Sequence, residues 1–282
     1  MNDTTRSPIE LFKPQTVIEG AGVRLLRSFG PSRENPLDPL LLFDHFGFND
    51  SIKGPIVGFP MHPHRGIETV TYMIHGKVNH KDSIGNSGSI TDGDVQWMTS
   101  GRGILHEEMP QQIEGEMKGF QLWVNLPARL KMTAPRYQNI TSDQIPEVQQ
   151  DGGVIIRVIA GEVDGTSGPV KEIVADPIYL DVSVPPNTYY SQGVASNYTA
   201  IAYVFEGGGD FGANGSSRES VVGHPRMIVF GGGDLVSVRA EDQGARFLLI
   251  AGKPLNEPIA RYGPFVMNTQ AEIEQTLDDL RK

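Results

Sequence analysis

The amino-acid sequence predicts an all-β protein built from two barrel-like domains, and three observations support this fold class. Glycine (33 residues) and proline (20 residues) are frequent in this chain of 282 residues, as in proteins whose short strands are joined by tight turns. Runs rich in β-branched and aromatic residues recur between such turns almost to the end of the chain. A weak internal repeat indicates that the same kind of barrel occurs twice.

The predicted strands share one pattern, an apolar run bounded by turn-forming residues. Clear examples are the runs 69–74, 155–160, 178–184, 199–205 and 246–250. Near the C-terminus the pattern changes, and residues 269–282 predict a helix. Thr269 and Glu272 form a capping box at its start. Ile273, Leu277 and Leu280 then mark one apolar face of the helix.

The internal repeat pairs Tyr72–Gly76 with Tyr203–Gly207, each a strand that ends in a glycine turn. The dipeptides Gly93-Asp94 and Gly233-Asp234 then precede a further strand in each half. The repeat implies a domain boundary near the middle of the chain. We therefore expect an N-terminal domain over residues 1–136, a linker over 137–146, and a C-terminal domain with the terminal helix over 147–282.

Charge and composition exclude several classes of function. The net charge of −10 and the lack of a basic stripe argue against direct nucleic-acid binding. The first eight residues lack the apolar core of a secretory signal, and no stretch approaches 18 apolar residues. We therefore expect a cytoplasmic protein with no membrane contact. The chain has no cysteine, so a bound metal must use histidine, carboxylate or water.

Two clusters of histidine carry the chemistry of this sequence. In an extended strand alternate residues lie on the same face, so His62 and His64 project together. His106 and Glu108 form a second such pair, while Glu107 points the opposite way. Two antiparallel strands inside a barrel can bring the pairs together. Three imidazoles and one carboxylate suit iron, manganese, nickel, copper or zinc rather than magnesium or calcium. The sequence thus predicts a mononuclear metal site.

The residues around these histidines resemble the two motifs of the cupin superfamily. The first motif, H-x-H-x3-E, begins here at His62 and ends at Glu68, and the second begins at Gly93 and ends at His106. The longer strings HPHRGIETVTYMIHG and GDVQWMTSGRGILHEEMP resemble the pirin family in particular, and so does the stretch 262–269. The resemblance extends over nearly the whole chain after about residue 10.

This resemblance implies a bicupin, two jelly-roll barrels in one chain, of which only the N-terminal barrel binds a metal, usually iron. It assigns the ligands to His62, His64, His106 and Glu108. We accordingly expect one Fe(II) per chain, with manganese, nickel, copper or zinc as alternatives. Many cupins use the glutamate of the first motif instead, here Glu68. Because Glu68 lies four residues past His64, roughly 13 Å along a straight strand, we favour Glu108.

The internal repeat makes a separate prediction for the second barrel. Counting from the repeated tyrosine and aspartate places four residues where the first barrel has its ligands: Gly193, Ala195, Arg246 and Leu248. These residues are no ligand set for a transition metal. We therefore expect a C-terminal barrel without metal, with a structural or regulatory role.

Other histidines and arginines near the motifs carry weaker signals. His75 and His80 flank a glycine turn, and we expect them to be solvated. His45 is expected in the core. Arg65 and Arg102 stand beside the ligand motifs, where contacts with carboxylates behind the ligands and a surface position are equally good interpretations.

The activity that the resemblance implies is cleavage of a flavonol such as quercetin by a dioxygenase, with release of carbon monoxide. Glu108 is expected to accept the proton of the substrate's 3-hydroxyl as a general base. A planar aromatic substrate needs an apolar cavity mouth. The candidates for that mouth are Phe43, Phe46, Met98, Met109 and Phe120.

A second interpretation comes from another class of protein. The pirin family also resembles regulators that bind a transcription factor or a metabolic enzyme, with the iron as a redox-sensing or structural element. Both interpretations need the same four ligands, so the motifs do not separate them. A bicupin isomerase acting on sugar phosphates or acids is a third and weaker interpretation.

Overall fold

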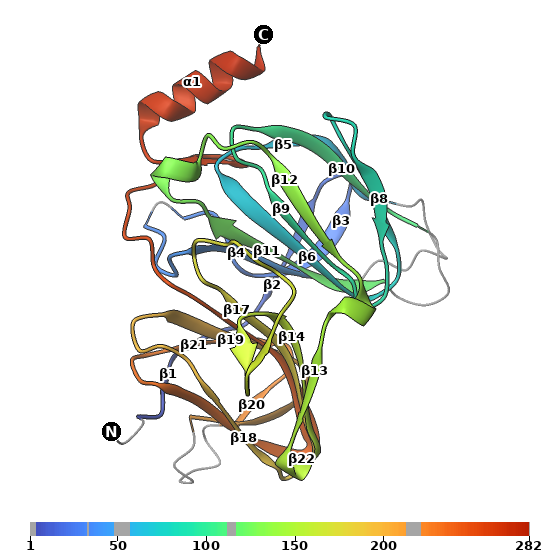
Figure 1. Cartoon of the computed structure of the whole chain (residues 1–282), viewed down its shortest axis with the longest axis vertical. Coiled ribbons are helices and arrows are strands. Elements are labelled where there is room, and N and C mark those ends of the chain that lie inside the picture. Colours follow the sequence, from blue (N-terminus) through green and yellow to red (C-terminus); the bar gives the residue numbers. More distant parts are fainter. Residues whose placement is uncertain (1–3, 33, 48–56, 112–116, 213–220, 282) are drawn as a thin grey trace. The chain divides into compact units, whose positions relative to one another are not determined.

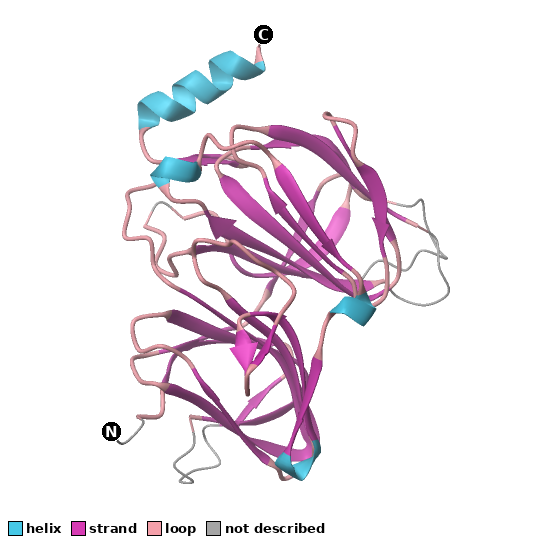
Figure 2. Cartoon of the chain, in the orientation of Figure 1, coloured by secondary structure: helices cyan, strands magenta, loops and turns pink. Residues whose placement is uncertain are grey.

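The computed structural model describes residues 4–32, 34–47, 57–111, 117–212 and 221–281. The chain forms two compact units, both made almost entirely of strands (Figure 2). The unit that we call the N-terminal barrel consists of residues 15–142 and 255–282. The unit that we call the C-terminal barrel consists of residues 1–14 and 143–254. Each barrel therefore includes one end of the chain that lies far from it in sequence.

The N-terminal barrel contains two antiparallel sheets (Figure 1). In spatial order the larger sheet contains β12 (Arg136–Ile140), β9 (Val95–Thr99), β6 (Ile67–His75), β11 (Lys118–Asn125), β4 (Leu40–Phe46), β3 (Val23–Phe29) and β2 (Gln15–Glu19). The smaller sheet contains β5 (Phe59–His64), β10 (Ile104–Pro110), β7 (Val78–Asp82) and β8 (Ser87–Ile90). A short 3₁₀ helix, η1 (Ala128–Leu130), follows β11.

Alternation along the central strands decides which side chains reach the barrel interior. On β6, Thr71 lines the interior cavity, whereas its neighbours Val70 and Tyr72 are fully buried and do not line it. On β11, Gln121 and Trp123 line the same cavity. The larger sheet thus presents polar groups and an indole to the interior.

The C-terminal segment completes the N-terminal barrel. It comprises β23 (Ala260–Tyr262), β24 (Phe265–Met267) and the helix α1 (Gln270–Leu280). The buried ammonium of Lys131 donates to the carbonyl oxygens of Gly66 (2.9 Å) and Val266 (2.7 Å). Arg65 forms an ion pair with Asp279 at 2.9 Å. The apolar face of α1 packs through Ile273 against β24. These contacts fix the segment to the loop that follows the first histidine motif.

The C-terminal barrel is a nine-stranded sheet and a small hairpin. Its main path contains β1 (Pro8–Phe12), β21 (Arg226–Phe230), β19 (Thr199–Phe211), β22 (Leu235–Gly252), β17 (Ile178–Val184), β14 (Val154–Ala160) and β13 (Glu147–Gln150). Off this path, β18 (Tyr189–Gly193) pairs with β22 and β20 (Val221–Gly223) pairs with β19. The hairpin joins β15 (Glu162–Val163) to β16 (Thr166–Ser167), and the 3₁₀ turns are η2 (Ser142–Gln144) and η3 (Asp151–Gly153).

The predicted strands and the predicted helix are confirmed. The five apolar runs lie in β6, β14, β17, β19 and β22. The capping box is present, because Thr269 accepts from the backbone N–H of Glu272, and the Glu272 side chain accepts from the backbone N–H of Thr269. Within the described residues, no helix has the length and apolarity needed to cross a bilayer.

The structure divides the chain differently from the expected domains 1–136, 137–146 and 147–282. The terminal helix belongs to the N-terminal barrel, and β1 pairs with β21 at the edge of the C-terminal barrel. The first part of the expected linker is β12, which pairs with β9. The physical reason is that strand pairing and helix packing join segments far apart in sequence, whereas the repeat reports only local order.

The repeat itself also needs a different alignment. β18 pairs with β22 as β5 pairs with β10, and β19 pairs with β21 as β6 pairs with β9. Because β19 also pairs with β22, the 18-residue β22 corresponds to both β10 and β11. Gly233-Asp234 therefore precedes the counterpart of β10 rather than of β9. Arg246 and Leu248 alternate with the core residue Phe247 and lie on the other face of β22. The interior counterparts of the ligand pairs are instead Tyr190 and Gln192 on β18 and Val238 and Ala240 on β22.

Candidate metal centre

Two paired strands of the smaller sheet bring the three predicted histidines together. β5 and β10 run antiparallel with His62 directly opposite His106 and with His64 opposite Ile104. The ring centroids are 4.4 Å apart for His62 and His106, 4.9 Å for His62 and His64, and 5.0 Å for His64 and His106. One donor nitrogen from each ring lies within 4.8 Å of the others. The His triad can therefore bind one metal ion.

The chemistry of the donors fits a transition metal. His64 and His106 are 3% and 1% exposed. Nδ1 of His64 and both ring nitrogens of His106 have no hydrogen-bond partner among the described residues. Burial, followed by the neighbouring imidazoles, lowers the pKa of His64 well below its ordinary value. Burial and then His62 lower the pKa of His106 to about 3. Neutral rings with unused lone pairs are what a metal requires.

His62 is the more accessible member of the triad and is oriented by the backbone. Its Nδ1 lies 2.9 Å from the carbonyl oxygen of Pro60. A carbonyl can only accept, so Nδ1 carries the proton and Nε2 keeps its lone pair. Such a contact behind a ligand fixes the ring and its tautomer.

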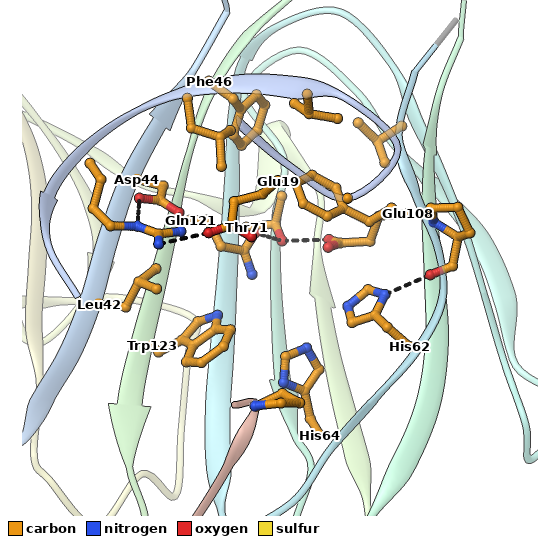
Figure 3. Close-up of a pocket in the computed structure, with 18 of the residues that line it drawn as sticks. Glu19, Leu42, Asp44, Phe46, His62, His64, Thr71, Glu108, Gln121 and Trp123 are labelled. Carbon is orange, nitrogen blue, oxygen red and sulfur yellow. Dashed lines mark hydrogen bonds and ion pairs between the residues drawn. The ribbon is translucent and has the colours of Figure 1, made fainter. Parts of the chain in front are cut away.

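Glu108 lies on the same strand face as His106 but not in the same cluster of donor atoms. It is 9% exposed and lines the cavity together with His62 and His64. The Thr71 hydroxyl donates to its Oε1 at 3.0 Å and lies 2.8 Å from the amide of Gln121 (Figure 3). Burial raises the pKa of Glu108, against the opposing effects of His62 and the Thr71 hydrogen bond. The carboxyl group is thus held beside the His triad with an enhanced affinity for a proton.

A second polar layer lies behind the triad on β7. His80 is opposite Glu108 and Asp82 is opposite His106 in the β7–β10 ladder. The ring of His80 stacks on Tyr137 of β12 at 5.7 Å. His80 is 5% exposed, and burial lowers its pKa. The expectation that His80 is solvated is therefore wrong. Its strand places it in the interior, and the following turn begins only after Asp82.

Two members of the His triad, His62 and His64, line a cavity of about 360 Å³. Figure 3 shows that His62, His64 and Trp123 point into it, with Glu108 on the same wall. Much of the remaining wall is apolar, with side chains from β3, β4 and β5, from the start of β7 and from the residue before β11. These apolar wall residues include Val23, Leu25, Leu42, Phe46, Phe59, Val78 and Met117. A small planar molecule fits a cavity of this size and lining.

Charged groups also line this cavity. Arg27 donates to both carboxylate oxygens of Asp44 at 2.8 Å and to Glu19 at 2.8 Å. The guanidinium of Arg261 lies over the ring of Trp123, 5.3 Å from its centroid. The cavity therefore combines a metal-binding end, an apolar wall and a cationic group.

Several predicted residues lie elsewhere. Glu68 accepts from the Thr99 hydroxyl at 2.7 Å and does not line the cavity. His45 packs on Phe120 (centroids 4.8 Å apart) and also lies outside the cavity lining. Of the five candidates for the apolar mouth, Phe46 lines the cavity and Phe43, Met98, Met109 and Phe120 do not. Strand parity explains this, because Phe43 and Phe120 alternate with lining residues.

The flanking arginines have different surroundings. Arg65 is largely buried, bonding Thr276 and Asp279 of α1, and Arg102 is exposed. Thr71, Gln121 and Trp123 line the cavity but lie in neither histidine motif, and strand parity on β6 and β11 predicts them only once the cavity face is known. No local signal in the sequence marks Arg261.

Comparisons with known proteins agree with this architecture. The family Pirin matches residues 22–124, and the Pirin C-terminal cupin domain matches residues 179–282. A pirin-like protein of Caulobacter vibrioides is 44% identical over 98% of this chain and 98% of its own length. The fold is thus a bicupin.

Solved structures extend the comparison to three dimensions. A quercetin 2,3-dioxygenase structure from Acinetobacter baumannii is 33% identical, with a TM-score of 0.90, and the match covers 99% of this chain and 97% of that one. A bacterial pirin of Escherichia coli in complex with nickel(II) shares the fold at 20% identity and a TM-score of 0.66, covering 87% of this chain and 99% of that one. With two matching family domains, a His triad in the first barrel and relatives along nearly its full length, this chain belongs to the pirin family.

Proposed function

We propose that this protein is a metal-dependent dioxygenase that cleaves a flavonol such as quercetin with dioxygen and releases carbon monoxide. The observation that carries the proposal is a His triad of which His62 and His64 line a cavity of about 360 Å³ with largely apolar walls. A structural metal site is closed by its protein ligands, whereas a catalytic site keeps a position for substrate. The similarity to the Acinetobacter baumannii quercetin 2,3-dioxygenase structure supports the same activity.

The proposed ligands are His62, His64, His106 and Glu108, with Fe(II) as the metal. Manganese, nickel, copper and zinc suit the same donors. Glu108 is included because it shares the strand face of His106 and lines the cavity. When bound, the ion supplies a Lewis acid for the substrate's oxygens and a redox centre for dioxygen.

Glu108 is also proposed as the general base. A flavonol binds productively as the anion of its 3-hydroxyl, so a group in the cavity must take that proton. Burial raises the pKa of Glu108, and the Thr71 hydroxyl holds its Oε1. A carboxylate with a raised pKa is a better proton acceptor than a solvated one. The Thr71 hydrogen bond keeps the carboxylate oriented during the transfer.

The apolar wall has a separate role. Val23, Leu25 and Phe46 surround space in which a flat ring system fits and water is poorly held. Excluding water strengthens the interactions of a charged enolate with its surroundings. It also protects a reactive intermediate from side reactions. The wall therefore supports the proposal that the ring is oxidised inside the cavity.

The test uses iron-loaded protein, quercetin in air, and detection of carbon monoxide, with turnover expressed per bound iron. Glu108→Gln should lower turnover about 10²- to 10⁴-fold, the usual worth of a general base. Glu107→Gln is the matched control, since Glu107 points the opposite way on the same strand. It should keep both its iron and its turnover.

Three results are distinguishable. Loss of turnover well beyond the loss of iron in Glu108→Gln supports the base role. Loss in proportion to iron makes Glu108 a ligand only. Absence of carbon monoxide from fully iron-loaded wild-type protein overturns the dioxygenase proposal, and a metal-dependent regulator with a protein partner then becomes the leading interpretation.

A further inference from the structure

A cation lies in the cavity close to the metal-binding end. Arg261 on β23 lines the cavity, and its Cζ is 5.3 Å from the centroid of the Trp123 ring. The ring of Trp123 meets the ring of His64 edge-on at 5.0 Å. The indole of Trp123 therefore lies between the guanidinium and the ring of His64, about 5 Å from each. A single small ligand can reach both.

The two arginines of the cavity differ in how their charges are balanced. Arg27 forms a bidentate pair with Asp44 and a further bond with Glu19. Arg261 donates through Nε to the carbonyl oxygen of Gly263 at 3.2 Å and forms no ion pair with a carboxylate of the described residues. Burial and then the charge of Arg27 lower its pKa to about 10. At neutral pH Arg261 is thus a partly buried cation without a counter-ion in the described part of the chain.

A charge in such a place is costly unless an anion joins it. A guanidinium presents a planar fork of donors that matches a carboxylate. With Nε bonded to Gly263, the Nη groups have no hydrogen bond to another described residue. The site is built on the C-terminal segment, which Lys131 and Arg65 hold firmly against the barrel. Arg261 is therefore placed to receive an anionic group of a ligand.

We infer that the cavity prefers planar hydroxy-keto acids, whose enol and keto oxygens would bind the metal held by the His triad while their carboxylate pairs with Arg261. This deepens the proposed function, on which its chelating end rests, by naming the substrate class. The aromatic body of such a ligand lies along Trp123 and the apolar wall. Quercetin carries no carboxylate, so it uses only part of these contacts.

A structural role for Arg261 is the alternative to be separated. Its stacking on Trp123 contributes through a cation–π interaction whatever the ligand. If that were its whole role, replacing Arg261 would disturb the cavity wall and weaken neutral and anionic ligands alike. The discriminating measurement is therefore the difference between two ligands that differ in charge alone at one position.

The probes are kojic acid and comenic acid, which share the hydroxypyranone chelating unit. Kojic acid carries a hydroxymethyl group where comenic acid carries a carboxylate. Affinities are measured by titration calorimetry on protein loaded with Zn(II), which does not turn over. Arg261→Gln should weaken comenic acid on the order of tenfold to a hundredfold, the worth of a charge-assisted hydrogen bond. It should change kojic acid by less than about threefold.

Two further variants complete the test. Arg261→Lys keeps the charge without the fork and should recover part of the affinity for comenic acid. Arg281→Gln removes a positive charge from the same segment, at a side chain that is 77% exposed, and should change neither probe. Raising the salt concentration should reduce the effect of Arg261→Gln only modestly, because buried charges are weakly screened.

An equal effect of Arg261→Gln on both probes, or no effect on comenic acid, overturns the inference. The inference is also overturned if the wild-type protein binds neither kojic acid nor comenic acid. These outcomes are independent of catalysis, since neither oxygen nor turnover enters the measurement. If the Arg261-dependent preference is found but quercetin yields no carbon monoxide, the anionic-ligand inference stands and the dioxygenase proposal fails.

Discussion

The two barrels share one strand pairing, but the side chains that it places in the barrel interior differ in kind. In the N-terminal barrel, β5 and β10 place His62 opposite His106 inside the barrel. In the C-terminal barrel, β18 and β22 place Tyr190 opposite Val238, and both belong to the hydrophobic core. The topology therefore provides a paired interior position, and the residue types placed there decide between a metal site and a packed core.

The consequence extends beyond the ligands. In the C-terminal barrel, Phe247 packs on Phe211 at 5.2 Å and on Tyr190 at 6.1 Å, and the surrounding interior is aliphatic. In the N-terminal barrel the interior keeps a cavity of about 360 Å³ beside the His triad. The interior of the first barrel thus keeps open space beside polar side chains, whereas the equivalent interior of the second is filled by apolar ones.

Removing one ligand is expected to have the largest effect. Wild-type protein should bind about one metal per chain, and His106→Ala should lower the affinity by at least about 100-fold. The reason is that even residues behind ligands contribute 10- to 100-fold to metal affinity. Elemental analysis and a competition titration measure both quantities. Glu107→Ala is the control. Two ions per wild-type chain, with one in the C-terminal barrel, would contradict the comparison.

The second prediction concerns the packed barrel. Phe247 is fully buried, so Phe247→Ala should lower the free energy of unfolding by about 3–5 kcal/mol. The metal content should stay near that of the wild type, because the substitution is in the other barrel. Urea unfolding followed by circular dichroism gives the first value and elemental analysis the second. Phe247→Leu should cost less than Phe247→Ala, because leucine leaves a smaller cavity. A large loss of metal in Phe247→Ala would show that the barrels are not independent in function.

Much of this comparison could be predicted from the sequence. The H-x-H and H-x-E spacings, with strand parity, bring His62, His64 and His106 together, because side chains in a strand alternate. The capping box predicts the start of α1 because it too is an interaction between residues close in sequence. Where structure depends on neighbours in sequence, the pattern was sufficient.

Contacts between segments far apart in sequence could not be predicted from local patterns. Nothing near Pro8–Phe12 indicates pairing with β21, and nothing near Arg261 indicates a place over Trp123. The repeat was misaligned because β22 is one strand where the first barrel has β10, a connection and β11. Counting residues across that difference assigned Arg246 and Leu248 to the interior. Such assignments depend on which strands pair, and the local sequence does not contain that information.

Acid should distinguish the barrels, because the C-terminal barrel has a single histidine, the exposed His224. In the N-terminal barrel, burial and then Lys118 lower the pKa of His45 to about 4. In the unfolded chain His45 takes up a proton near pH 6.5, whereas in the folded protein it does so only near pH 4. Stability is therefore lost as the pH falls from about 6.5 to about 4, by at most about 3 kcal/mol for this group.

The measurement compares wild type with His45→Gln in the same metal state. Urea unfolding between pH 4 and 7 gives the dependence of stability on pH, and taking the difference between the two proteins cancels the other titrating groups. The wild type should show the steeper fall. Parallel curves would mean that His45 takes up its proton equally in the folded and unfolded chains.

The smallest expected effect tests which barrel the terminal helix supports. Thr269→Ala removes the hydroxyl that accepts from the N–H of Glu272, and such a cap contributes about 1 kcal/mol. Both tryptophans, Trp97 and Trp123, belong to the N-terminal barrel, so their fluorescence reports its unfolding. The urea midpoint followed by fluorescence should therefore fall. Thr166→Ala, a threonine of the C-terminal barrel, should leave it unchanged. If Thr269→Ala leaves this transition unmoved, α1 contributes nothing to the barrel that contains the His triad, and the contacts of Arg65 with the helix are incidental.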